Sequence, residues 1–171
     1  MEKPNSINLG RGSHLVRRLA NGLGVATVLG LLAGVAALAS TNRQVVVDPI
    51  TGRALFGFDP VAYFVDRTAR TGSETFAGTW AGATWHFVNV GNMKAFLDAP
   101  QAYAPQFGGY GALSVARGLT TAGRPVIFEI HEDRLYLFYS ETNRHIWLKS
   151  PDEFIAAAND RWPDVKRRLT R

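Results

Sequence analysis

The stretch TFAGTWAGATWHFV, residues 75–88, decides the fold. Thr75–Trp80 and Thr84–Val88 are rich in aromatic and β-branched residues, as β-strands usually are. The small residues 81–83 between them favour a turn, so the pair predicts an antiparallel hairpin. Successive strand residues point to opposite faces, so we expect Trp85 and Phe87 on one face and His86 on the other.

The sequence after this hairpin predicts further strands and helices. Asn89 is expected to cap a short helix that runs to Leu97, and Pro100 to end it. A second hairpin and two C-terminal helices follow, with predicted bounds Val126–Ile130, Leu135–Tyr139, Glu141–Lys149 and Pro151–Arg161. We therefore expect an α+β fold: a small antiparallel sheet of two hairpins with packed helices, and no internal repeat.

The composition is that of a globular protein without disulfides. Of the 171 residues 46% are hydrophobic, which is enough for a core, and none is cysteine. The net charge of +5 comes from the two ends, because residues 1–39 hold four basic groups against one acidic group and four of the last six residues are basic. The middle of the chain is slightly acidic, whereas a nucleic-acid-binding domain needs a basic face. We expect no nucleic-acid partner.

An uncharged stretch near the N-terminus predicts a membrane span. No charged residue occurs from Leu19 to Asn42, and Arg17 and Arg18 stand just before it. About 20 apolar residues cross the hydrocarbon layer, and flanking basic residues stay on the cytoplasmic side. We expect residues 1–18 to be cytoplasmic, 19–40 to lie in the membrane and 41–55 to form a linker. The folded domain is then expected on the extracytoplasmic (periplasmic) face of the inner membrane.

Two interpretations of residues 19–40 remain open. Ala37, Leu38 and Ala39 form an A-x-A pattern, and cleavage after Ala39 would release a secreted or periplasmic domain. The stretch is longer than the roughly 7–15 apolar residues of a signal peptide, which favours a retained anchor. Gly30 and Gly34 form a small-xxx-small pair that suits contact with another membrane helix, as in an accessory subunit of a membrane complex.

Several short motifs occur in the folded part of the chain. They are FDPVAYF at 58–64, Trp80-x-Gly82-x-x-Trp85-x-Phe87, Asn92-x-x-x-Phe96, Pro100-x-x-Tyr103-x-Pro105-Gln106-x-Gly108-Gly109-Tyr110, Leu135-Tyr136-Leu137 and Trp162-Pro163. In this order they resemble the YHS-domain proteins, in their longer exported form. The resemblance implies a YHS-like domain over 56–165, similar to small treble-clef-like modules, followed by a basic tail at 166–171.

The resemblance also bears on metal binding. Paired cysteines of the family are thought to bind a metal ion, and their positions correspond to Val88, Asn92 and Gly111 in this chain. Soft-metal sites need thiolate or thioether ligands, which none of these three residues supplies. We therefore expect no metal and no cofactor at these positions.

The best candidate for a binding site is the aromatic and glycine-rich run from Gln106 to Gly111. Its glycines allow positive φ or a close approach of the backbone to a ligand. We predict a pocket beside this run, with the ligand-binding residues Tyr63, His86, Gln106, Gly108, Gly109 and Tyr110. Asp59, followed by Pro60, is expected to cap a turn.

The sequence favours binding over catalysis. It contains no serine-nucleophile motif, no phosphate-binding loop and no paired metal-ligand motif, so no catalytic residue is predicted. We expect a non-enzymatic, membrane-tethered extracytoplasmic module that binds a small ligand or a partner protein. The alternative is a copper- or zinc-handling protein that uses His86 with oxygen or imidazole ligands. His86, His131 and His145 follow no short ligand spacing.

Overall fold

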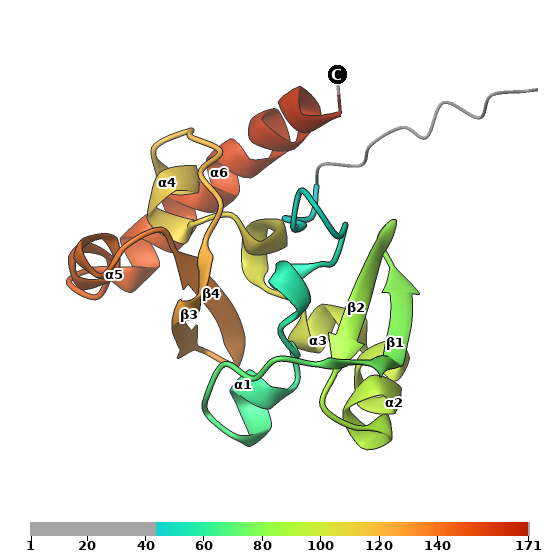
Figure 1. Cartoon of the computed structure of the whole chain (residues 1–171). Helices are drawn as coiled ribbons and strands as arrows, with labels where there is room; N and C mark the ends of the chain where they lie inside the picture. The colour runs from blue at the N-terminus through green and yellow to red at the C-terminus, as the bar shows by residue number, and fades with distance from the viewer. Residues whose placement is uncertain (1–43, 171) are drawn as a thin grey trace, which may run out of the picture. The chain divides into compact units, whose positions relative to one another are not determined.

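The computed structural model describes residues 44–170, and the predicted span 19–40 lies outside them. Within residues 44–170 no helix is both long and apolar enough to cross a membrane. The expected α+β class is confirmed, but the two hairpins form two separate two-stranded antiparallel sheets (Figure 1). A register shift in the longer strand of each hairpin bends that strand, and the hairpins meet through side chains instead of backbone hydrogen bonds.

The first half of the domain is built around the hairpin predicted at 75–88. Its elements are η1 (Leu55–Gly57), α1 (Ala62–Val65), β1 (Ser73–Trp80), β2 (Ala83–Phe87), α2 (Val90–Asp98) and α3 (Pro100–Tyr103). The side chain of Asn89 accepts a hydrogen bond from the backbone N–H of Asn92 at 2.8 Å, so it caps α2 as predicted. Pro100 follows α2 and stands in the first turn of α3.

The second half repeats this succession of elements. They are η2 (Gln106–Gly109), α4 (Ala112–Ala116), β3 (Arg124–His131), β4 (Arg134–Phe138), α5 (Glu141–Trp147) and α6 (Pro151–Leu169). The helix α4 was not predicted. α6 continues past its predicted end at Arg161, through Pro163, so the described part of the basic tail is helical as far as Leu169. Pro163 cannot donate a backbone hydrogen bond, and the full burial of Val165 offsets the cost of that loss.

The two halves follow one supersecondary pattern, contrary to the expectation of no repeat. The long strands begin at Ser73 and Arg124 and the short strands at Ala83 and Arg134, a spacing of 51 residues in each case (124 − 73 and 134 − 83). The register shift falls at the same place in both hairpins. A run of three residues with positive φ precedes the short helix in each half, at 55–57 and 107–109.

The repeat preserves the shape of the core more than the identity of its residues. Phe96 of α2 contacts three aromatic rings of the first hairpin, and Trp147 of α5 contacts the rings at the three corresponding positions of the second. The centroid distances are 5.8 Å to Trp80, 4.8 Å to Trp85 and 5.3 Å to Phe87 in the first set, and 5.6 Å to His131, 5.2 Å to Tyr136 and 5.3 Å to Phe138 in the second. Only Phe87 and Phe138 are the same residue, which explains why the sequence did not reveal the repeat.

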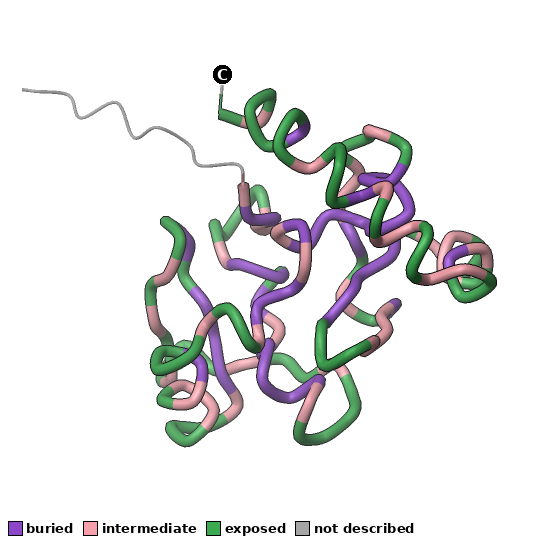
Figure 2. The backbone as a smooth tube through the Cα atoms, turned by 180° about the vertical axis from the view of Figure 1, so that it is seen from behind, coloured by how far each residue is buried: buried purple, intermediate pink, exposed green. Residues whose placement is uncertain are grey.

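The two hairpins share a core. Leu135 and Leu137 of β4 pack in the same buried cluster as Trp85 and Phe87 of β2. Figure 2 shows buried residues through the middle of the domain and exposed ones on its outer helices. Residues 44–55, in the expected linker, belong to the folded domain, since they include the buried residues Val45, Val46, Ala54 and Leu55.

Candidate ligand-binding groove

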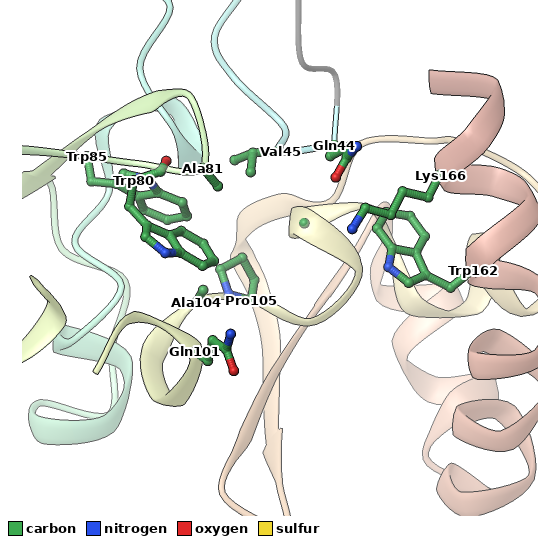
Figure 3. A pocket seen from close by; sticks show the side chains of 11 residues that line it. Gln44, Val45, Trp80, Ala81, Trp85, Gln101, Ala104, Pro105, Trp162 and Lys166 are labelled. Atoms are coloured by element: carbon green, nitrogen blue, oxygen red, sulfur yellow. The ribbon is translucent and has the colours of Figure 1, made fainter. Parts of the chain in front are cut away.

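A groove of about 280 Å³ lies between the tip of the first hairpin and the C-terminal part of α6 (Figure 3). The N-terminal segment, α3 and η2 complete its walls. We call it the Trp80 groove and define it by Gln44, Trp80, Gln101, Gly108, Trp162 and Lys166. These residues are far apart in the sequence, so only the tertiary fold brings them together.

Two tryptophans form the aromatic walls of the groove. The ring of Trp80 packs edge-on against Phe96, with ring centroids 5.8 Å apart. The backbone carbonyl of Trp80 accepts a hydrogen bond from the indole N–H of Trp85 at 3.0 Å. On the other side, Trp162 packs edge-on against Phe107 at 5.8 Å. Both walls are half-buried and held by core residues, so their remaining surface is available in a fixed orientation.

The polar groups of the groove are mainly hydrogen-bond donors. Figure 3 shows the ammonium of Lys166 and the indole nitrogen of Trp162 on the side of the groove. Within residues 44–170, Lys166 forms no ion pair and no side-chain hydrogen bond, and the indole N–H groups of Trp80 and Trp162 donate to no acceptor. No carboxylate is among the groove's described lining residues. The site is therefore aromatic, positively charged and rich in donors.

The groove continues into a second hollow of about 250 Å³, which shares Trp80 and Gln101 with it. Gln106 and Arg134 line this extension, and the guanidinium of Arg134 donates a hydrogen bond to the carbonyl of Gln101 at 3.2 Å. The extension likewise has no carboxylate among its described lining residues, whereas Asp98 lines a third hollow that also shares Trp80 and Gln101. Each of the two hollows is therefore lined by one cation, the groove by Lys166 and its extension by Arg134.

Gly108 in η2 is required for this arrangement. It has a φ of +62°, and a Cβ added to it would lie 1.8 Å from the carbonyl oxygen of Gln44. The backbone N–H of Val46 donates to the carbonyl of Gly108 at 2.8 Å, which ties the N-terminal segment across η2. The close approach expected at this glycine is thus made by the chain itself, and it places Gln44 on the wall of the groove.

The predicted binding residues are divided by the structure. Gly108 lines the groove and Gln106 lines its extension, whereas four residues line neither hollow: Tyr63, His86, Gly109 and Tyr110. Tyr63 is fully buried, its hydroxyl donates to the carbonyl of Pro125 at 3.0 Å, and burial raises its pKa. It packs in the core of the first hairpin, so its described contacts are structural.

His86 and Tyr110 lie in different surroundings from Tyr63 and from each other. Burial lowers the pKa of His86, and the positive charge of Arg53 lowers it further. Tyr110 packs against Trp162 at 6.2 Å, behind the wall of the groove, in the core of the second half. The structure therefore does not bring Tyr63, His86 and Tyr110 together around one described hollow.

Asp59 makes the polar link that holds the first half together. It is fully buried, and its Oδ1 accepts the backbone N–H of Val61 at 2.8 Å, which is the predicted cap. Its Oδ2 accepts the backbone N–H of Val88 at 2.8 Å and the side-chain amide of Asn92 at 2.7 Å. The resemblance placed metal-binding thiols at the positions of Val88 and Asn92. Here both residues instead donate hydrogen bonds to one buried carboxylate.

A second cluster of polar groups was not predicted. One ligand atom from each of His131, Glu132 and Asp152 lies within 4.8 Å of the others, and His131 Nε2 is 3.0 Å from Asp152 Oδ1. In the 51-residue repeat these residues correspond to Trp80, Ala81 and Gln101 of the groove. The cluster could not be predicted from the sequence, because Asp152 reaches it only when α6 packs beside the tip of the second hairpin.

Comparison of the chain with protein-family models, with curated proteins and with solved structures finds no match.

Proposed function

We propose that this chain is a non-enzymatic, YHS-like module that binds a small ligand in the Trp80 groove. Residues 19–40 tether it to the membrane, with the domain on the extracytoplasmic face. The observation that carries the proposal is the convergence of two half-buried indoles and the ammonium of Lys166 on one concave surface. Ligand sites are typically concave, with aromatic walls and a few polar groups that orient the ligand.

The chemistry of the lining residues supports binding over catalysis. General acid–base catalysis normally uses histidine or carboxylate side chains with suitable pKa values. The described lining of the groove and of its extension contains neither, and its titratable side chains are those of Lys166 and Arg134. Indole surfaces, amides and fixed cations are suited to holding a ligand in one orientation.

Mass spectrometry of small molecules that co-purify with the full-length chain tests this proposal. Gln101 is exposed and lines both hollows, so Gln101→Tyr fills the groove without altering the core. Thr142→Tyr makes the same kind of change at an exposed position of α5 and serves as the control. We expect a molecule that the wild type and Thr142→Tyr retain and Gln101→Tyr loses. Equal retention by all three proteins, or turnover of the bound molecule, contradicts the proposal.

A metal-handling function is the second candidate, and the cluster of His131, Glu132 and Asp152 favours it. One imidazole and two carboxylates are ligands that zinc accepts, with water completing the coordination. His86 is less suited to this role, because it is buried near the positive charge of Arg53. The alternative function therefore moves from His86 to the tip of the second hairpin.

Zinc titration by calorimetry separates the two candidates. If the cluster binds zinc, His131→Ala abolishes the binding heat, whereas His145→Ala does not, because His145 lies outside the cluster and contacts the carbonyl of Glu141. Zinc binding that is equally strong in both variants excludes this site, and no binding by the wild type excludes the second candidate.

A further inference from the structure

We infer that the ligand of the Trp80 groove is the phosphate-bearing headgroup of an anionic membrane lipid. The inference rests on the proposed function and adds the chemical class and the source of the ligand. Three features carry it: the sign of the charge in the groove, the two indole walls, and the short chain distance between the predicted span and the groove.

The first feature is an unneutralised positive charge. Neighbouring cations on α6 are engaged elsewhere, since Arg167 pairs with Asp164 and Arg168 donates to the carbonyl of Gly118 at 3.0 Å. Lys166 has no such partner within residues 44–170 and points into the groove in Figure 3. An ammonium with nearby N–H donors and no lining carboxylate favours an anion over a neutral or cationic ligand.

The second feature is the pair of indoles. Tryptophan is well suited to the boundary between water and lipid, because its ring is apolar and its N–H is polar. The N–H groups of Trp80 and Trp162 have no acceptor within the described part of the chain. A lipid headgroup offers phosphate and glycerol oxygens as acceptors, and its glycerol and first methylene groups supply apolar surface for the rings.

The third feature is the position of Gln44 on the wall of the groove. Only residues 41–43 stand between the predicted span 19–40 and Gln44. Four residue steps of fully extended chain cover at most about 14 Å. A retained anchor therefore keeps this wall of the groove close to the outer leaflet, where lipid headgroups are concentrated. A soluble anion of the same chemistry would have no such advantage.

The indole signals of the protein provide a direct test. The chain has four tryptophans, so ¹⁵N-tryptophan labelling of the full-length protein in neutral detergent gives four indole N–H signals. We would titrate it with dihexanoyl phosphatidylglycerol, with zwitterionic dihexanoyl phosphatidylcholine, and with glycerophosphoglycerol, the headgroup alone. We expect saturable shifts of the Trp80 and Trp162 signals with the anionic lipid. The Trp147 signal should not shift, since Trp147 is buried in the core of the second half.

Charge variants complete the test. Lys166→Gln should weaken binding of the anionic lipid by about tenfold or more, as expected for a lost hydrogen bond to a charged group. Lys94→Gln, at an exposed position of α2, should bind like the wild type. Equal affinity of wild type and Lys166→Gln, or absence of shifts at Trp80 and Trp162 with all three probes, overturns the inference.

The remaining outcomes separate the source of the ligand from its chemistry. Equal affinity for the headgroup alone and for the lipid keeps the anion site but assigns it to a soluble phosphate ester. Shifts with phosphatidylcholine as strong as those with phosphatidylglycerol refute an anion-selective site. In that case, as in the absence of any shift, the proposed function still depends on whether Gln101→Tyr loses a co-purifying molecule.

Discussion

Replacement of Asp59 by asparagine should destabilise the domain strongly, although the two side chains have nearly the same shape. The carboxylate is fully buried and accepts hydrogen bonds from Val61, Val88 and Asn92 at 2.7–2.8 Å. In Asp59→Asn one oxygen can still accept from Val61. The new NH₂ group then faces the N–H of Val88, from which it cannot accept, and Asn92, whose amide must turn its oxygen toward it and loses its hydrogen bond to a charged acceptor.

The expected loss follows from these two contacts. A hydrogen bond to a charged group contributes roughly 1.5–3 kcal/mol, and a buried donor left unpaired costs a comparable amount. Two such contacts give a loss of about 3–5 kcal/mol in the free energy of unfolding. Domains of ordinary size are stable by roughly 5–15 kcal/mol, so this single atom change removes a large part of the stability.

Urea unfolding of the full-length chain in neutral detergent, followed by tryptophan fluorescence, measures the effect, because all four tryptophans lie in the described domain. Asp66→Asn is the control, since within residues 44–170 the Asp66 carboxylate pairs with the exposed Arg70 alone and should contribute less than about 1 kcal/mol. Asn92→Asp in the Asp59→Asn background should restore part of the loss, because the new amide then donates to a charged acceptor. A loss no larger than that of Asp66→Asn, or strictly additive effects in the double variant, would refute the reasoning.

Three further predictions concern stability. Unfolded histidine binds a proton near pH 6.5, whereas burial lowers the pKa of His86 in the folded state, so the free energy of unfolding should fall as the pH drops below about 6.5. His86→Gln should remove this fall in urea titrations at about pH 7.5 and 5.5, and an unchanged pH dependence would contradict it. Gly108→Ala should release the N-terminal segment to proteolysis, because the added Cβ would clash with the carbonyl of Gln44. Gly52→Ala is the control, since Gly52 has a φ of +71° and open space around it, and the change should lower the free energy of unfolding by only about 1 kcal/mol. Trp147→Phe should lower the free energy of unfolding by less than about 1.5 kcal/mol, because the indole N–H of Trp147 is buried without a partner in the described residues and phenylalanine fills the corresponding position 96. Phe96→Ala should lower it by about 3–5 kcal/mol, and equal losses of the two variants in thermal unfolding would contradict the repeat.

Local features of the fold were predictable from the sequence. The hairpins at 75–88 and 126–139 and the cap at Asn89 follow from strand propensity, turn residues and capping, which act between residues close in the chain. The predicted end of α6 at Arg161 was wrong, because burial of Val165 is a tertiary effect that local preference does not contain. The repeat escaped detection because aromatic shape, and not residue identity, recurs at its core positions.

The candidate site was only partly predictable. The glycine-rich run pointed to Gln106 and Gly108, which line the groove and its extension. Trp80 and Trp162 occur in the motifs quoted above and Lys166 in the basic tail, but nothing in the sequence indicated that these three residues line one groove, since tryptophan at a strand end and lysine on a helix are ordinary in any domain. Their role depends on the tertiary fold, which places the C-terminal part of α6 across the groove from the tip of the first hairpin.

The sequence by itself determined the α+β class, both hairpins and the absence of thiolate chemistry, because strand pattern and residue type are local properties. Only the tertiary structure decided that the hairpins form separate sheets, that Asp59 joins Val88 to Asn92, and that two tryptophans and one lysine share a groove. These features depend on contacts between residues tens of positions apart, and which of those contacts form is settled by the packing of the whole core.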